Sequence, residues 1–554
     1  MNGGRFARGA ALAAAFAVLA ALVIDPLRGL FAASLAGGGL GRYAALLAEP
    51  IHRAALKESL VLSAASVIAA FFVGVPLALL THDLGRFGRI LRGAAFAPLL
   101  LTPVLGVLGF YFLCGRDGVI TRLVPGYEGD FRGFGAVLAV HAATLFPFFF
   151  SFTAAALERF DRGLIDAARS LGATPFRAFV GVVLPALVPG LVGAGALTFM
   201  SAMASFTAPY VFGGGERVLT VAIVVARQDA PADAAALSIV LLAASLASLL
   251  PLALLRKRAA GGKGSGARSS PLAGGDGTRF VRGAVAAVVS AIVFLPLAVV
   301  LLVSFKSDGR LGRENLFAGL STEHYRAALS GIFSRDGFGP TAELAACIGR
   351  ALLFAAIATA VGAVFALVLS LAGRDVKGPV RVVLFAAAAL PFAVPGTALA
   401  LALLESFATR GPLGIGGGLI GSVVILPLAY FVRNMPLQVR ATEAAMAQLP
   451  SDVESASRTL GRGAVATALR VTLPLLVPGV VSGALLAFFA GAGEFVASVL
   501  LCTVFTKPAS VAIYEQFAGA DFGGAAAAGV LLAVLTALAA VLLRVAANLV
   551  ARFR

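Results

Sequence analysis

The chain has 554 residues, of which 60% are hydrophobic and 13% are charged, and its mean hydropathy is +0.97. Soluble domains contain about 45–50% apolar and about 25% charged residues, so this composition excludes an ordinary water-soluble enzyme. Uncharged runs of roughly twenty residues, the length that crosses about 30 Å of hydrocarbon, recur along the whole sequence. The composition therefore predicts a multi-spanning protein of the lipid bilayer.

The charge balance is strongly basic, with 44 Lys and Arg against 27 Asp and Glu. No basic stripe with interleaved aromatic residues is visible and the chain has no Trp, so we expect no nucleic-acid partner. Membrane proteins collect Lys and Arg in their cytoplasmic loops, which explains the excess. Cys114, Cys347 and Cys502 are scattered, and we expect neither a disulfide framework nor a bound metal.

Hydropathy predicts an all-α protein with about twelve membrane-spanning helices. Twelve spans place both termini on one side, and the distribution of Lys and Arg favours a cytoplasmic N-terminus and C-terminus. The predicted spans are 10–27, 58–80, 94–114, 134–156, 183–211, 234–255, 283–305, 346–372, 382–405, 414–436, 472–502 and 524–547.

A segment rich in Gly, Ser and Arg divides the twelve spans into two sets of six. It covers residues 256–280, opens with three consecutive basic residues and has no apolar periodicity, which is typical of a flexible linker. We therefore expect a first transmembrane domain at 1–255, a basic cytoplasmic linker at 256–280 and a second transmembrane domain at 281–554.

The two halves repeat each other. Gly172, Leu184 and Pro185 recur at one constant spacing as Gly461, Leu473 and Pro474. Equal span numbers and the same starting side indicate a parallel repeat, related by an axis along the membrane normal. A two-fold arrangement around a central path favours a transport protein.

The cytoplasmic segment after the fourth span predicts two short helices joined at a glycine. Asp161 can cap the first helix, and Gly172 suits the left-handed position that ends it. Thr174 and Pro175 then supply an N-cap and a first-turn proline for the second helix. In the other half, Ser451 and Glu454 have the spacing of a capping box that opens a similar unit.

These two segments resemble the coupling loop of type I ABC importer permeases, whose pattern is E-A-A, three residues, G, nine residues and I-x-L-P. The first copy matches with an Asp in place of the Glu, and the second has Ser there, beside an acid one residue earlier. The resemblance implies that both loops contact an ATPase and that the second docks it differently or more weakly. The implied contact residues are Asp166, Ala167, Ala168, Gly172, Leu184 and Pro185, and then Glu454, Ser455, Ala456, Ser457, Gly461, Leu473 and Pro474.

Two further segments, 390–396 and 426–436, resemble the fused two-domain permeases of ferric-iron importers. Thiamine, aminoethylphosphonate and polyamine permeases are close relatives of that family, so these cargoes remain alternatives. The resemblance implies a bacterial inner-membrane permease that binds two copies of a cytosolic ATPase and receives cargo from a periplasmic binding protein.

The chain itself has no recognisable nucleotide site, because the one Gly-Lys pair, Gly262-Lys263, lacks the other P-loop residues. We therefore expect no catalytic residue and no cofactor on this chain. ATP and Mg²⁺ belong to the partner ATPase.

One acidic residue, Glu494, lies inside the eleventh span, where a charge is expensive and indicates function. The repeat aligns Glu494 and Phe495 with Ser205 and Phe206, and we expect these four residues to line the translocation path. The carboxylate either attracts a cation in transit or pairs with an Arg of a neighbouring helix. His141, in the fourth span, is expected to be a hydrogen-bonded packing residue.

A gradient-driven secondary transporter is the alternative of another class. The segment 83–89 resembles the D-R-x-G-R-R loop of the major facilitator family in an imperfect register. That alternative does not predict the duplicated loop around Gly172 and Gly461.

Overall fold

The computed structural model describes residues 2–552 except 101, 117, 159, 162, 214–217, 248–275, 308–318, 334–339, 375, 409–417 and 450. Its described part is helical, with one isolated β-bridge between Lys306 and Leu320, so the all-α prediction is confirmed. The first half contains α1 (Asn2–Leu19), α2 (Asp25–Leu35), α3 (Gly41–Ala48), α4 (Pro50–Thr81), α5 (Gly85–Ala94), α6 (Ala97–Leu100), α7 (Pro103–Cys114), α8 (Val119–Leu123), α9 (Gly133–Glu158), α10 (Gly163–Ser170), α11 (Pro175–Ala178), α12 (Leu184–Met203), α13 (Thr207–Phe212), α14 (Leu219–Asp229) and α15 (Pro231–Ala247).

The second half repeats this order. It contains α17 (Asp276–Val303), α18 (Glu323–Phe333), α19 (Pro340–Gly373), α20 (Pro379–Ala393), α21 (Gly396–Ala408), α22 (Ile425–Ala447), α23 (Ser451–Thr459), α24 (Ala464–Thr467), α25 (Leu473–Ala492), α26 (Val496–Leu501), α27 (Ala509–Ala518) and α28 (Phe522–Arg552). Within the described residues, nine helices are long and apolar enough to cross a membrane, and the bent pair α20–α21 makes a tenth.

Four of the predicted spans are interrupted, so the prediction of continuous helices was wrong there. The third span breaks between α6 and α7, and the ninth bends by 110° between α20 and α21. Pro103 and Pro395 stand at these two breaks, where a missing backbone N–H does least harm. The fifth and eleventh spans break after α12 and α25 without a proline.

One other span was misplaced and one is described only in part. The sixth, predicted at 234–255, is helical as α15 over its described residues, and residues 248–255 lie outside the described part of the chain. The tenth, predicted at 414–436, is α22, which begins later and runs into a polar segment. Of the predicted linker, residues 256–275 lie outside the description and 276–280 belong to α17.

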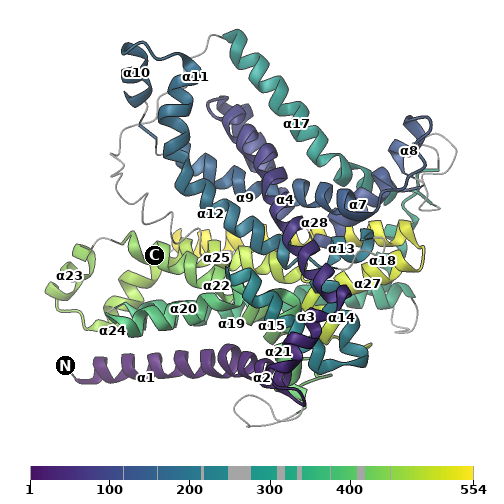
Figure 1. The fold of residues 1–554 in the computed structure, drawn as a ribbon. Coiled ribbons are helices and arrows are strands. Elements are labelled where there is room, and N and C mark those ends of the chain that lie inside the picture. The colour runs from purple at the N-terminus through teal and green to yellow at the C-terminus, as the bar shows by residue number, and fades with distance from the viewer. Residues whose placement is uncertain are drawn as a thin grey trace.

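The first helix of each half packs against the other half (Figure 1). Helix α1 contacts α19 and α20, whereas α17 contacts α4 and α7. Arg282 on α17 donates to the carbonyl oxygens of Leu79 (3.0 Å) and His82 (2.7 Å). These carbonyls lie at the C-terminal end of α4, where helical partners run out. The two halves are therefore interlocked by a reciprocal exchange.

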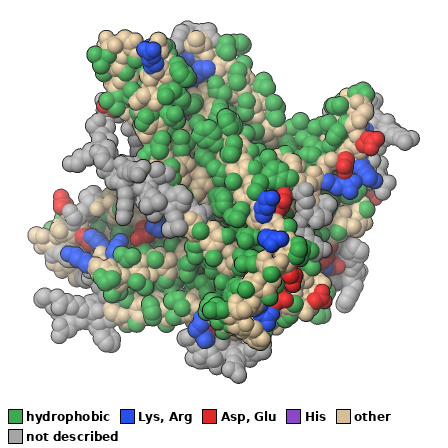
Figure 2. Space-filling view, in the orientation of Figure 1, with side chains coloured by type: hydrophobic (Ala, Val, Ile, Leu, Met, Phe, Trp, Pro, Cys, Tyr) green, Lys and Arg blue, Asp and Glu red, His purple; other side chains and the backbone are tan. Residues whose placement is uncertain are grey.

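The outer surface of the long helices is apolar. Figure 2 shows hydrophobic side chains covering most of these helices, with charged side chains gathered in separate clusters. Phe72, Ile68 and Leu542 are exposed although they lie in spanning helices. Exposed apolar surface of this extent belongs in lipid. Helix α1 begins, and α28 ends, toward the same side of the molecule as α10 and α23 (Figure 1).

Candidate functional site

The first predicted coupling loop has the backbone that its sequence indicates. Helix α10 stops at Gly172, whose φ is +84°. The N–H of Gly172 donates to the Arg169 oxygen (2.9 Å), and the N–H of Ala173 donates to the Ala168 oxygen (3.0 Å). This pair of bonds is a Schellman motif. A Cβ at Gly172 would meet no atom within 4 Å, so the positive φ alone requires glycine.

The residues around that glycine act as caps. The Asp161 carboxylate accepts from the N–H of Gly163 (2.9 Å), and the Thr174 hydroxyl accepts from the N–H of Arg177 (3.3 Å). A π-helical turn, Phe179–Val183, then joins α11 to α12. Leu184 and Pro185 are the first two residues of α12, so the loop continues directly into a spanning helix.

The second coupling loop repeats this path. Gly461 has φ +81°, and the N–H of Arg462 donates to the Ser457 oxygen (3.2 Å). A second π-helical turn, Ala468–Thr472, occupies the position equivalent to the first. Helix α25 then begins with Leu473 and Pro474. π-Helical turns are rare in proteins, and many of those that occur lie at functional sites.

The acidic residues of the two loops are placed differently. The Asp166 carboxylate is exposed, and no described residue pairs with it. The Glu454 carboxylate is largely buried, forms an ion pair with Arg374 and accepts a hydrogen bond from the Thr472 hydroxyl (2.8 Å). The acid of the second loop is thus held by its own chain.

Both loops present apolar side chains to the outside. Leu171 is 89% exposed beside Gly172, and Leu460 is 82% exposed beside Gly461. Ala167 and Ala456 are also exposed, while Ser457 is buried and its hydroxyl lies 3.1 Å from that of Thr467. Leu171 and Leu460 occupy equivalent positions of the repeat, so each loop exposes one leucine beside its glycine.

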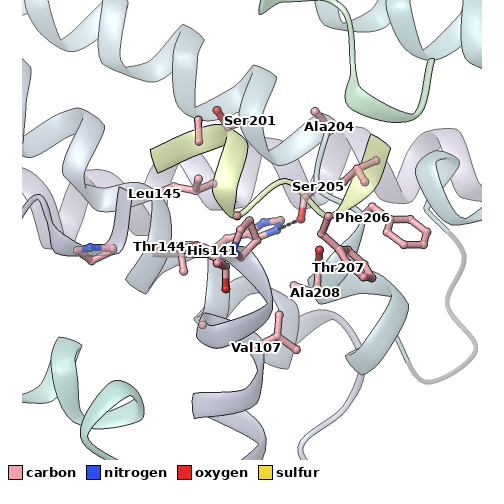
Figure 3. A pocket seen from close by; sticks show the side chains of 18 of the residues that line it. Val107, His141, Thr144, Leu145, Ser201, Ala204, Ser205, Phe206, Thr207 and Ala208 are labelled. Carbon is pink, nitrogen blue, oxygen red and sulfur yellow. Dashed lines mark hydrogen bonds between the residues drawn. The ribbon is translucent and has the colours of Figure 1, made fainter. Parts of the chain in front are cut away.

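A cavity of about 390 Å³ lies between the two halves, where all four broken spans meet. Its wall includes Thr102 and Val394, next to the starts of α7 and α21, and Ser205 and Glu494, next to the starts of α13 and α26. Figure 3 shows His141, Thr144 and Ser205 on one side of it, all from the first half. Volumes of several hundred Å³ are typical of small-ligand sites.

The four predicted path residues lie together at this cavity. The rings of Phe206 and Phe495 stack across it, with centroids 6.1 Å apart and an interplanar angle of 29°. Because these residues occupy equivalent positions of the repeat, their contact marks the pseudo-two-fold axis. Ser205 and Glu494 precede them in the two helix breaks.

The breaks after α12 and α25 are each held by a side chain from an earlier long helix of the same half. In the first half, His141 on α9 lies 2.9 Å (Nε2) from the Ser205 hydroxyl and 2.8 Å (Nδ1) from that of Ser66. Figure 3 draws the bond to Ser205. His141 is thus a hydrogen-bonded packing residue, as predicted.

In the second half the tie is an ion pair. Arg433 on α22 lies 2.8 Å (Nε) from Glu494 (Oε2), and the other carboxylate oxygen accepts from the N–H of Ala497 (3.1 Å). Sequence reasoning left this partner unnamed. The repeat aligns Arg433 with Thr144, which Figure 3 shows at the same cavity. This alignment is the sequence signal that could have identified Arg433 as the partner of Glu494. Glu494 lines the cavity and its carboxylate pairs with an arginine of a neighbouring helix, which is the second of the two alternatives, while attraction of a cation stays a prediction.

Metal ligands do not gather anywhere in the described part of the chain, where no group of three or more His, Cys, Asp or Glu side chains could hold an ion. The cavity wall is instead apolar and hydroxyl-rich around its single ion pair.

The duplicated helical architecture has a match among known proteins. The model of the binding-protein-dependent transport system inner membrane component family matches residues 54–259 and again residues 358–552. The chain belongs to this family. It is a fused two-domain permease of the ABC importer class, with one family unit in each half.

Individual relatives agree. A probable ABC transporter permease of Sinorhizobium fredii is 29% identical over 97% of this chain and 95% of its own length. A ferric transport system permease of Actinobacillus pleuropneumoniae is 25% identical over 87% of this chain and 69% of its own length. A molybdenum transport system permease of Mycobacterium tuberculosis is 33% identical but matches 36% of this chain and 78% of its own length.

Proposed function

We propose that this permease imports ferric iron across a bacterial inner membrane, driven by two copies of a cytosolic ATPase and supplied by a periplasmic binding protein. The similarity to a ferric permease over 87% of this chain and the segments 390–396 and 426–436 support iron as the cargo. Thiamine, aminoethylphosphonate and polyamine remain alternatives, and the molybdenum relative adds an oxyanion.

The observation that supports this function best is the paired coupling loop. Two identical backbone motifs, centred on Gly172 and Gly461, lie toward one side of the molecule and expose apolar tips (Figure 1). Each leads through a π-helical turn into a helix of 20 residues that ends at the cavity. A helix of that length spans about 30 Å. Closure of the two ATPases would push on α10 and α23, and α12 and α25 would carry the displacement to Ser205 and Glu494.

This proposal places both termini and both coupling loops in the cytoplasm, with the domain division at 1–255, 256–280 and 281–554. ATP and Mg²⁺ bind to the ATPase, and the loop residues named above form the two docking sites. The exposed Asp166 is available to a basic residue of the ATPase, whereas Glu454 already pairs with Arg374.

The test is affinity purification of the tagged chain in mild detergent, followed by mass spectrometry. We expect an ATPase to co-purify with the wild type and to be lost from the double variant Gly172→Pro/Gly461→Pro. The matched control is Gly126→Pro/Gly418→Pro, because these glycines also have positive φ and open surroundings but lie outside both loops. That control should retain the ATPase.

A chain that purifies alone and supports gradient-driven uptake would overturn the proposal in favour of a secondary transporter. Any binding protein that is recovered is then assayed for ferric iron, thiamine, phosphonate, polyamine and molybdate. ATP-dependent uptake of radioactive iron into reconstituted vesicles tests the cargo.

A further inference from the structure

The charged side chains that line the central cavity are not equally free to bind a ligand. Among its described lining residues, Arg433 and Glu494 are the only Arg, Lys, Asp or Glu side chains. Both ring nitrogens of His141 are hydrogen-bonded to serine hydroxyls. The ligand preference of the cavity therefore depends on which member of the Arg433–Glu494 pair keeps free hydrogen-bonding groups.

Glu494 keeps few. It is 8% exposed, one carboxylate oxygen faces Arg433 Nε, and the other accepts from the N–H of Ala497 at the start of α26. Its backbone oxygen accepts from the hydroxyls of Ser498 (2.5 Å) and Ser510 (2.7 Å). A cation at this carboxylate would meet the positive charge of Arg433 beside one oxygen and compete with the helix-capping bond at the other.

Arg433 keeps more. Only Nε is used by Glu494, and no described residue accepts from Nη1 or Nη2. The side chain is 25% exposed, on the wall of the cavity. Its neighbour Asn434 lines the same cavity and is 6% exposed, and its amide Nδ2 donates to no described residue. That nitrogen is itself buried beside Gly491 of α25, so the free charged donors at this part of the wall are those of Arg433.

Helix ends add to this excess of donors. Helices α7 and α21 both begin beside the cavity, at Thr102 and Gly396. The Arg433 guanidinium lies directly against the start of α21, since a Cβ on Gly396 would come within 2.5 Å of Nη1. A helix N-terminus has partial positive charge, and an arginine beside it leaves a local excess that an anion would compensate.

We infer that the cavity contains an anion subsite, in which Arg433 binds the oxygens of the cargo and Glu494, as its ion-pair partner, offsets part of the arginine's charge. This inference rests on the proposed transport function and specifies its cargo as an oxygen-rich anion. For iron, ferric ion would cross within a complex whose oxygen ligands make it net negative. Arg433 binds such oxygens through two parallel N–H groups.

The experiment measures the thermal unfolding of the purified full chain in lipid nanodiscs against increasing ligand, because a ligand of the folded state raises the unfolding temperature. The anionic probes are sodium molybdate and ferric citrate, with citrate alone beside them. Spermidine is the cationic probe. We expect the anions to raise the unfolding temperature and spermidine to leave it unchanged.

Three variants assign the effect. Arg433→Gln should weaken anion binding by about tenfold or more, the usual effect of losing a charged hydrogen bond. Glu494→Gln, whose amide oxygen can still cap α26, frees the arginine and should strengthen binding. Arg350→Gln is the matched control, because it makes the same substitution at an arginine that donates to a backbone oxygen (Lys507, 3.0 Å) and does not line the cavity. It should bind as the wild type does.

Should Arg433→Gln fold poorly, Arg433→Gln/Glu494→Gln removes both charges together and should show the same loss. Stabilisation by spermidine that Glu494→Gln abolishes would overturn the inference, and so would the absence of a shift with every anion. The proposed function is tested separately by ATPase co-purification and iron uptake. Uptake that depends on Glu494 and tolerates Arg433→Gln would refute the anion subsite and leave the transport function standing.

Discussion

The two coupling loops share a backbone and differ in how they are attached. The first rests on apolar side chains: Leu157 and Phe160 at the end of α9 pack with Val183 and Leu187. The second is attached through polar contacts, because Glu454 binds Arg374 and Thr472. A duplicated motif has thus kept the glycine that its geometry requires, while the surrounding contacts have diverged.

The same contrast recurs at the two helix breaks. Ser205 is tied by a neutral hydrogen bond to His141, and the equivalent Glu494 is tied by an ion pair to Arg433. Positions that share backbone geometry therefore have different electrostatics in each half. Among the described residues that line the cavity, the fully charged side chains come from the second half.

The largest difference between the halves should appear when the helix ties are cut. Arg433→Ala leaves the Glu494 carboxylate buried without its partner, which costs about 3–5 kcal/mol. Ser205→Ala removes one neutral hydrogen bond and should cost about 1 kcal/mol. Unfolding of both variants in mild detergent measures the difference. The double variant Arg433→Ala/Glu494→Ala should recover most of the loss, and equal losses for the two single variants would contradict the contrast.

The loop glycines should behave alike. Gly172→Ala and Gly461→Ala each force an L-residue into the left-handed region, at a cost of about 1–2 kcal/mol, and neither Cβ meets a neighbour. We expect a similar weakening of ATPase retention from either change, read by quantitative pull-down. Gly181→Ala, in the first π-helical turn and with open space for a Cβ, is the control. A large difference between the two loops would show that their geometry is not equivalent in function.

The loop acids should behave differently. Asp166→Asn changes an exposed side chain, so the unfolding temperature should stay constant while ATPase binding weakens. Glu454→Gln should instead lower stability by about 0.5–1 kcal/mol, because it weakens the tie to the partly exposed Arg374. The two readouts are unfolding and pull-down for each variant. Loss of stability in Asp166→Asn would break the comparison.

The smallest effect concerns pH. Burial raises the pKa of Glu443 on the polar end of α22, against the opposing effect of Arg440 and Arg381. A carboxyl whose pKa is raised on folding binds its proton more tightly in the folded state. Stability therefore falls as pH rises from the ordinary pKa through the raised one.

Glu443→Gln should remove that slope and leave the chain more stable than the wild type at neutral pH. The first half has Ala154 at the equivalent position, so Ala154→Ser serves as a control without a titrating group. Unfolding temperatures from acidic to neutral pH measure the effect. An unchanged slope in Glu443→Gln would assign the dependence to another group.

Local signals in the sequence predicted the helical class, the duplication and the backbone of both loops. A glycine before a Leu-Pro pair at fixed spacing specifies a helix end wherever it occurs, as at Gly172 and Gly461. The breaks after α12 and α25 were not predicted, because they contain no proline and apolar residues continue on both sides of Ser205 and Glu494. The Glu494–Arg433 and Glu454–Arg374 pairs join residues far apart in the chain, and only the packed helices show them.

The exchange of α1 and α17 between the halves has a consequence for assembly. Without the first half, the surface of α19 and α20 that α1 covers would be exposed. Without the second half, the surface of α4 and α7 that α17 covers would be exposed. The covalent junction between the halves is therefore not what joins them. Two separately translated halves should find each other in the bilayer and form the same permease, and gene fusion would only fix their stoichiometry at one to one.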